Sequence, residues 1–369
     1  MKKICIISPA AYLLFKENEK FYSAGGAEAQ LKTIGLALAK QSYEVHYIVD
    51  DFGQPLREKI GDITAHKVAL KYRGGPNYYL LTCWITLLKT LYEIGADIHL
   101  IKLPRHLLFP LALFCKFMKK KLIFISQTDW DADLASLKKA ENNFSYWFFR
   151  IGLLWVNYVV TQNEKQRKGF LKSYGRKAQI IKNALTLPDC KNFKEKGYIL
   201  WVGNSHNAKQ PEKFIELAKC LPEYQFKMIM ALVSQNPNDS FVRDKLGSIP
   251  NLEYLGFVPF SHIADYFKGS SLFVSTSVRE GFPNTFLQSW QYRTPVVSLY
   301  IDPDGVIERY NLGRISGSFR KMCADIKELM ADKGLRKKMG RDIENYINEN
   351  HSLQMVISQY LNLFEQDQT

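Results

Sequence analysis

The sequence predicts an α/β protein with two doubly wound domains. Short apolar runs, typical of buried parallel strands, alternate along the chain with longer segments of helical periodicity. The alternation pauses between residues 183 and 196 and then begins again. A chain of 369 residues with 46% hydrophobic content is long enough and apolar enough to build two ordered cores.

The first half of the chain alternates strand and helix from its start. Residues 3–8 form an apolar run, and residues 27–40 repeat Leu31, Ile34 and Leu38 at helical spacing. The next expected elements are strands at 45–49, 98–101, 122–125, 158–161 and 178–181, with helices at 78–94 and 107–118. We expect these units to form a first domain, residues 1–187.

A second alternating series follows the segment 183–189, which we interpret as a linker because it ends in Leu-Pro-Asp before a lysine-rich turn. The expected strands are 198–202, 271–275 and 295–299, and the expected helices end at Cys220 or span 334–350 and 352–365. Further units at 225–230, 252–255 and 263–268 complete the series. These units predict a second domain, residues 188–350.

The net charge of +14 lies mostly in the first half. Residues 1–190 hold 28 Lys and Arg against 16 Asp and Glu (+12), and the remaining residues hold 22 against 20 (+2). One interpretation is a solvated basic surface, and the other is a face that meets phospholipid or a phosphate-bearing acceptor. No recognisable nucleic-acid-binding motif accompanies these charges, so we expect no nucleic acid partner.

Two further patterns bear on membranes. Lysines end the apolar segment 107–118, and residues 144–155 are unusually aromatic. Aromatic residues beside lysines suit a membrane interface, although aromatics at helical spacing are more often core residues. The longest apolar run, 107–115, is about half of what a spanning helix needs, and the chain start lacks a signal-peptide pattern. We therefore expect a cytoplasmic protein, either free or peripheral to a membrane.

The cysteines do not indicate a metal site or a disulfide framework. They are dispersed, without C-x-x-C spacing, and most of them are best interpreted as small core residues. The six are Cys5, Cys83, Cys115, Cys190, Cys220 and Cys323.

The clearest candidate site is the stretch 277–290. Its Gly-Phe-Pro loop, residues 281–283, follows an expected strand and runs directly into an expected helix, whose first free N–H groups favour anions. Glu280 lies just before this loop, and its two oxygens can accept hydrogen bonds from neighbouring hydroxyls. A ligand that combines sugar hydroxyls with phosphate is a nucleotide sugar, and the stretch therefore predicts a site for one.

Three other segments follow expected strands. Gly203, Asn204 and Lys209 precede a helix, as in a phosphate-binding loop with a point charge. The Gly25-Gly26 pair is either a flexible turn or a ligand-approaching loop. Asp129 opens a D-x-D-x-D run that suits catalysis, a metal or simply a solvated helix start, but the glycine and distal glutamate of a calcium loop are missing.

The run EGFPNTFLQSWQYRTPVVS resembles the donor-site signature of the GT-B glycosyltransferases of the large retaining family (glycosyltransferase family 4, glycosyl transferases group 1), which includes many bacterial polysaccharide-assembly enzymes. That signature has two glutamates with seven residues between them. Glu280 matches the first, and Gln288 stands in place of the second. The resemblance implies that Glu280 holds the transferred sugar and that Gln288 binds ribose through its amide oxygen. The implied diphosphate cradle is Gly281, Phe282, Pro283, Asn284, Thr285 and Phe286.

The resemblance also assigns roles outside the signature. Gly25 and Gly26 would approach the donor phosphate and the acceptor. Asp129 matches the aspartate of a His-Asp pair, with Thr128 in place of the histidine. Lys209 matches a lysine that neutralises the diphosphate, whereas Asn204 stands where the family has an arginine. The implied catalytic residues are Glu280, Lys209 and Asp129.

The resemblance covers essentially the whole chain. It implies a GT-B enzyme with a cleft between its two Rossmann-like domains and a last helix, 351–369, that packs back on the first domain. It also implies retaining hexosyl transfer from a nucleotide-diphosphate sugar to a glycan or polyprenyl-diphosphate-linked acceptor in cell-surface polysaccharide synthesis, with no metal or cofactor. Two alternatives stay open: a sugar-nucleotide epimerase or phosphorylase of the same fold, and an inactive GT-B partner of an active transferase.

Overall fold

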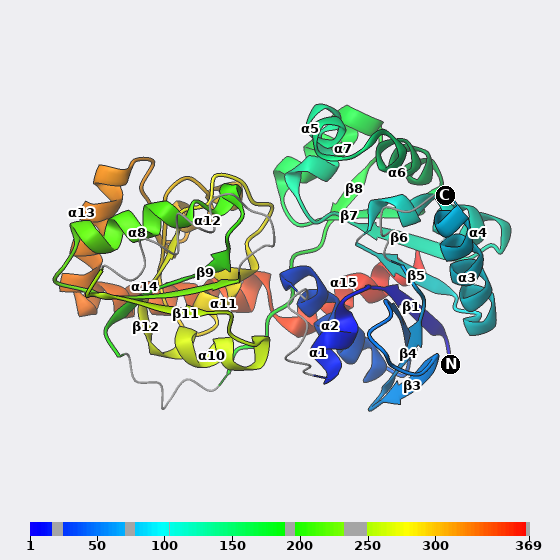
Figure 1. Ribbon diagram of the computed structural model, residues 1–369, viewed down its shortest axis with the longest axis horizontal. Coiled ribbons are helices and arrows are strands. Elements are labelled where there is room, and N and C mark those ends of the chain that lie inside the picture. The colour runs from blue at the N-terminus through cyan, green and yellow to red at the C-terminus, as the bar shows by residue number, and fades with distance from the viewer. Residues whose placement is uncertain (17–24, 71–77, 103, 189–195, 232–248, 367–369) are drawn as a thin grey trace. The chain divides into compact units, whose positions relative to one another are not determined.

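The computed structural model describes residues 1–16, 25–70, 78–102, 104–188, 196–231 and 249–366 (Figure 1). The chain divides into two compact units. Unit 1 comprises Met1–Ala184 and Leu353–Thr369, and unit 2 comprises Leu185–Ser352. The limits expected from the sequence were 187/188 and 350/351. Residue 189 of the expected linker and residues 190–195 of the lysine-rich turn after it lie outside the described residues.

Unit 1 contains an eight-stranded sheet in the order β3-β4-β2-β1-β5-β6-β7-β8. All neighbouring strands are parallel except β3 and β4, which form an antiparallel edge. The strands are β1 (Lys3–Ile7), β2 (Glu44–Val49), β3 (Arg57–Ile60), β4 (Ile63–Lys67), β5 (Ile98–Ile101), β6 (Lys121–Ile125), β7 (Tyr158–Thr161) and β8 (Ala178–Ile180).

Helices cover both faces of this sheet. The helices are α1 (Ala11–Lys16), α2 (Gly26–Ala39), α3 (Tyr78–Ile94), α4 (Leu108–Phe117), α5 (Leu134–Ala140), α6 (Asn143–Trp155), α7 (Glu164–Tyr174) and α15 (Leu353–Glu365), with 3-10 turns η1 (Arg105–Leu107) and η2 (Asp129–Ala132). Alternate residues of a strand point to opposite faces. In β1, Ile4 and Ile6 therefore pack against α2 and α15, whereas Cys5 and Ile7 pack against α3, α4 and α6.

Unit 2 contains a six-stranded parallel sheet in the order β11-β10-β9-β12-β13-β14. Its strands are β9 (Tyr198–Asn204), β10 (Gln225–Ala231), β11 (Leu252–Gly256), β12 (Ser270–Ser275), β13 (Val296–Ser298) and β14 (Gly313–Ile315). Its helices are α8 (Pro211–Cys220), α10 (Phe260–Gly269), α11 (Asn284–Trp290), α12 (Val306–Arg309), α13 (Phe319–Ala331) and α14 (Lys333–Asn350), with 3-10 turns η3 (Asn207–Lys209) and η4 (Pro303–Gly305).

Two separate clusters of buried side chains pack on the two faces of the unit 2 sheet. Ile199 and Trp201 of β9 pack with α8 and α13, and Leu200 between them packs with α10, α11 and α14. The predicted fold class, two doubly wound α/β domains, is therefore confirmed. Within the residues that the structure describes, no helix combines the length and apolar character needed to cross a bilayer.

Candidate functional site

The carboxyl edge of the unit 2 sheet has the geometry of a ligand site. From β9 the chain moves to β10 and β11 on one side, and β12, β13 and β14 then extend the sheet on the other side. The loops that leave β9 and β12 therefore diverge onto opposite faces of the sheet. In doubly wound sheets, ligands bind at the carboxyl ends of the strands at such a switch point.

Hydrogen bonds join the loop after β9 to the loop after β12. Val278 N donates to Ala208 O at 2.9 Å, and Thr276 Oγ1 donates to Lys209 O at 2.6 Å. The buried indole Nε1 of Trp201 donates to Thr276 Oγ1 at 3.0 Å. These bonds fix the backbone of Lys209 against the strand that delivers the second loop.

The same two loops bring two predicted catalytic residues together. Lys209 Nζ forms an ion pair with Glu280 Oε1. The two side chains are 26% and 17% exposed, so the pair is shielded from water but still reachable by a ligand. An ammonium group has three donors and a carboxylate has two oxygens, so each partner can bind a ligand without giving up the other.

Most of the loop that follows Glu280 is packed into the core. The rings of Phe282 and Phe286 are 5% and 0% exposed and contact Trp290, with centroids 6.2 and 5.8 Å apart. These two rings are therefore occupied by packing, and only their backbone atoms are left for ligand contacts. Gly281 and Pro283 are also buried, whereas Asn284, Thr285 and Gln288 are half-buried.

Gly203 and Asn204 lie in a strand and not in the loop predicted for them. β9 continues to Asn204, and these two residues pair with Met230 and Ala231 of β10. A Cβ atom at Gly203 would lie 2.6 Å from the Trp201 ring, so packing alone requires glycine there. Asn204 is exposed, and its Oδ1 accepts a hydrogen bond from His206 N at 3.2 Å.

Unit 1 has its own switch point, between β1 and β5. Gly25 is the N-cap of α2 and Gly26 is its first residue, and Gly25 N donates to Glu28 Oε2 at 3.0 Å. Lys102 follows β5 directly and is only 2% exposed. Burial lowers the pKa of Lys102 to about 8, and the carboxylates of Glu28 and Asp131 oppose this shift. A buried cation therefore lies at the carboxyl edge of this sheet.

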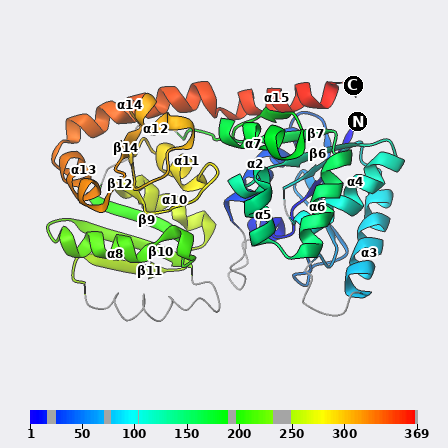
Figure 2. The ribbon, with the colours of Figure 1, turned by 90° about the horizontal axis from the view of Figure 1, so that it is seen from above.

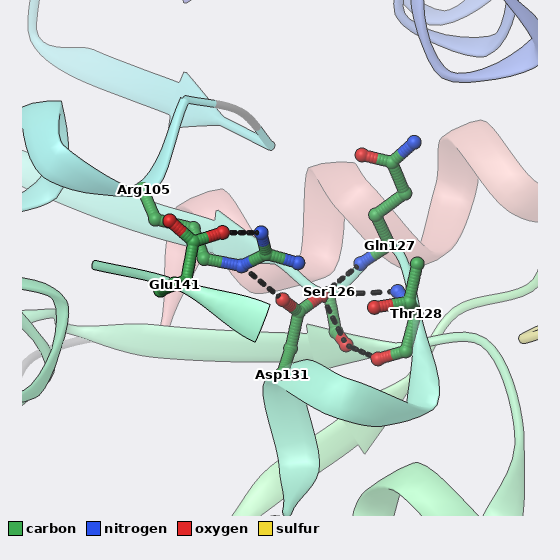
Figure 3. Close-up of polar contacts among 6 residues, drawn as sticks. All are labelled: Arg105, Ser126, Gln127, Thr128, Asp131 and Glu141. Atoms are coloured by element: carbon green, nitrogen blue, oxygen red, sulfur yellow. Dashed lines mark hydrogen bonds and ion pairs between the residues drawn. The ribbon is translucent and has the colours of Figure 1, made fainter. Parts of the chain in front are cut away.

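The acidic segment after β6 is organised by Asp131 and not by Asp129. Asp131 is fully buried and accepts hydrogen bonds from Gln127 N at 2.7 Å, Thr128 N at 3.0 Å and Arg105 Nε at 2.7 Å (Figure 3). Its carboxylate shapes the backbone that leads from β6 into η2. These local hydrogen bonds therefore account for the burial of the Asp131 carboxylate.

Asp129, which the sequence predicted to be catalytic, lies in the same turn but is more accessible. Its side chain is 22% exposed, and it accepts from Lys165 Nζ at 2.7 Å and from Gln166 Nε2 at 3.3 Å. The third acid, Asp133, caps α5 by accepting from Ser136 N at 2.8 Å. Across the described ranges of the chain, no three His, Cys, Asp or Glu side chains are grouped so as to hold a metal ion.

Sequence reasoning missed Lys102, Glu28 and Arg105. Lys102 had a visible signal, since it is a cation placed directly after the apolar run IHLI at the end of a predicted strand. Glu28 and Arg105 had no such signal in the sequence. Their interactions, with Lys102 and Asp131 respectively, depend on which loops meet at the sheet edge.

Comparison with known proteins finds a family model that matches part of unit 2. Residues 196–332 match the family model described as glycosyl transferases group 1. An uncharacterised glycosyltransferase of Methanocaldococcus jannaschii is 24% identical over 316 residues, which is 79% of this chain and 80% of the relative.

Solved structures give the fold. Sucrose-phosphate synthase from Thermosynechococcus elongatus aligns with a TM-score of 0.77 at 13% identity, over 99% of both chains. A TarM variant from S. aureus, in complex with fondaparinux, alpha-GlcNAc-glycerol and UDP, aligns with a TM-score of 0.78 at 12% identity, over 99% of this chain and 100% of that one. The lipopolysaccharide outer core galactosyltransferase WaaB aligns with a TM-score of 0.64 at 14% identity, over 98% of both chains. The shared architecture is the GT-B fold.

Proposed function

We propose that this chain, a glycosyltransferase of the group 1 type with the GT-B fold, moves a hexose from a nucleotide-diphosphate sugar to a glycan or polyprenyl-diphosphate-linked acceptor. The transfer retains the anomeric configuration, as in glycosyltransferase family 4, and serves cell-surface polysaccharide synthesis. Similarity of the stretch 280–298 to the family's donor signature supports the donor class.

The observation that carries this proposal is the Lys209–Glu280 pair at the switch point of the unit 2 sheet. A nucleotide-diphosphate sugar needs a cation for its diphosphate and an acceptor for its sugar hydroxyls. The loops after β9 and β12 supply one of each, from segments 71 residues apart in the sequence, and hydrogen bonds between these loops hold both in place.

Each partner has a distinct role in the proposed reaction. Glu280 accepts hydrogen bonds from hydroxyls of the transferred sugar, and Lys209 donates to the diphosphate. As the bond between the anomeric carbon and the phosphate oxygen breaks, negative charge grows on the leaving diphosphate, and a fixed ammonium group stabilises that charge. A donor phosphate oxygen takes the proton of the acceptor hydroxyl, so no protein base and no metal ion are required.

The other predicted residues support the donor or the acceptor. The backbone of Gly203 and of residues 281–286 holds the diphosphate, together with the side chains of Asn204, Asn284 and Thr285. Gln288 binds the ribose through its amide oxygen, which replaces a carboxylate with a weaker acceptor. On unit 1, Gly25, Gly26 and Asp129 act on the acceptor and the donor phosphate.

We also propose that unit 1 makes peripheral contact with an anionic membrane. A polyprenyl-linked acceptor is confined to a bilayer, so an enzyme that uses one has to work at its surface. The excess of positive charge in the first half of the chain supports this contact.

A transfer assay tests the proposed function. The purified chain is given sugars linked to UDP, GDP, ADP, CDP or dTDP together with glycan and lipid-linked acceptors, and NMR of the product reports the anomeric configuration. Glu280→Ala should reduce the rate by about a hundredfold or more, the scale for loss of one preorganised transition-state contact. Glu344→Ala is the matched control, since Glu344 is also ion-paired, with Arg293, in unit 2.

Near-normal transfer by Glu280→Ala would reject the site. Donor binding without transfer to any acceptor would instead identify the chain as an inactive partner of another transferase.

A further inference from the structure

Helix α6 exposes a stripe of large apolar side chains. Phe144, Trp147, Ile151 and Leu154 recur at helical spacing and are 42%, 54%, 37% and 65% exposed. The spacing places all four on one face, over a length of about 15 Å. Four large exposed apolar residues in one row are unusual, because the surfaces of soluble proteins rarely carry large contiguous apolar patches.

The helices beside α6 also carry exposed apolar side chains. Figures 1 and 2 both show α3, α4 and α6 next to one another in unit 1. The ring of Trp84 in α3 lies 5.8 Å from Phe109 of α4 and 4.9 Å from Phe148 of α6, so aromatic contacts join the three helices. Further exposed side chains lie on α3 and at the end of α4: Ile85, Tyr92, Phe117 and Met118.

Basic side chains line a hollow where α4 and α6 end. The hollow has a volume of about 550 Å³, and Lys116, Lys119, Lys120 and Arg176 lie in its wall, together with Leu154 from the α6 stripe. Among the residues that the structure describes, no carboxylate lines it. A second hollow of about 530 Å³ shares Lys119 and Lys120 and adds two more lysines and one acid, Lys2, Lys121 and Asp97.

Local structure explains only part of this positive charge. Lys116 lies in the last turn of α4, where the helix dipole favours a cation, and Lys120 is ion-paired with Asp97 at 2.9 Å. Lys119 follows the helix, is exposed and has a φ of 53°, and no ion pair with another described residue accounts for its charge. The hollow keeps a net positive charge beside an apolar stripe.

We propose that this hollow binds the phosphate headgroups of anionic phospholipids while the α6 stripe inserts at the level of the acyl chains. This proposal rests on the membrane contact proposed above. The hollow and the α6 stripe are the surface of unit 1 that makes this contact. A helix with aromatic and aliphatic residues on one face and cations at its border is suited to lie in the plane of a membrane interface.

The basic hollow favours a lipid over a second copy of this chain. In a symmetric dimer both copies would bring a basic hollow to the same interface, and its described lining offers no carboxylate to pair with these cations. An anionic headgroup layer complements both features at once, because it offers phosphates to the lysines and acyl chains to the stripe.

Vesicle co-sedimentation tests the site with the full-length chain. Phosphatidylcholine vesicles with and without phosphatidylglycerol are compared for the wild type, Lys116→Gln/Lys119→Asn, Trp147→Gln/Leu154→Gln, and the control Lys337→Gln/Lys338→Gln. Asparagine is used at position 119 because it tolerates the left-handed backbone there. The control removes the same charge from the exposed face of α14 in unit 2.

The wild type should bind vesicles that contain phosphatidylglycerol and release them at high salt. The double lysine variant should lose about 30-fold in partition coefficient, which corresponds to about 1 kcal/mol for each lysine near an anionic surface. The partition coefficient of the stripe variant should fall at least about tenfold. Its residual binding should be more sensitive to salt than that of the wild type, because only the electrostatic contact is left. The control should bind like the wild type.

Each other outcome overturns a defined part. Equal binding by the wild type and the double lysine variant would reject the headgroup site while leaving the membrane contact. No vesicle binding by the wild type would reject both, although glycosyl transfer to a lipid-free acceptor would leave the enzymatic proposal intact. Self-association without lipid that is lost in the stripe variant would replace the lipid with a second copy.

Discussion

Replacing the buried lysine of unit 1 should stabilise the protein. Lys102 is 2% exposed, and burial lowers its pKa from 10.5 to about 8. Each unit of difference between these two pKa values corresponds to about 1.4 kcal/mol by which the charged lysine destabilises the folded state. At pH 7 both the folded and the unfolded states carry the proton, so the full penalty of about 3 kcal/mol acts on wild type. Lys102→Met removes it.

The pH dependence gives the prediction its sign. Between pH 8 and 10.5 the unfolded state binds more protons than the folded state, so the free energy of unfolding of the wild type rises with pH. The advantage of Lys102→Met should therefore shrink by about 2.5 kcal/mol between pH 7 and pH 10. Comparing variant with wild type at each pH cancels the titration of all other groups.

Urea unfolding followed by a short deuterium pulse provides the assay. Peptides that cover β5 report the unfolding of unit 1, since a central strand exchanges only when its unit opens. Lys337→Met, at an exposed position of α14, is the control and should be neutral. A Lys102→Met variant that is no more stable than wild type at pH 7, or an advantage that is the same at pH 10, would refute the reasoning.

Two further predictions concern unit 1. His99 is fully buried and burial lowers its pKa to about 4, so wild type should lose stability as the pH falls from 6.5 toward 4, by about 3 kcal/mol, and His99→Leu should flatten this loss in the same assay. Asp131→Asn breaks a buried pair with Arg105 and should cost about 3 kcal/mol in urea unfolding, whereas Asp129→Asn in the same turn should cost less than about 1 kcal/mol. Equal effects of the two aspartate substitutions would contradict the conclusion that Asp131, and not Asp129, organises the turn after β6.

The sequence predicted the central strands of both sheets well, because those strands are short apolar runs between clear turns. It missed β3 and β4, whose sequences REKI and ITAHK form an antiparallel edge and carry partly exposed polar residues. It also missed β14, a strand of three residues. β3 and β14 are edge strands and β4 lies next to an edge, where strands need fewer apolar residues, so their sequence pattern is weak.

For the site, local sequence identified Glu280 and Lys209 separately but not their contact. That contact depends on β9 and β12 being neighbours in the sheet, which the order of strands along the chain does not reveal. The roles of Phe282 and Phe286 show the opposite limit. Their place in the motif suggested a ligand cradle, but the structure uses both rings to pack α11 onto the core.

Donor binding by two single variants tests the central claim most directly. Thermal shifts are measured with nucleoside diphosphates and with the corresponding nucleotide sugars for wild type, Glu280→Gln and Lys209→Met, because a ligand that binds only the native state raises its apparent stability. We expect one nucleotide sugar to shift the wild type more than its diphosphate does. Glu280→Gln should lose that difference but still bind the diphosphate, and Lys209→Met should lose most of both shifts. If both variants respond like the wild type, the Lys209–Glu280 pair is not the donor site.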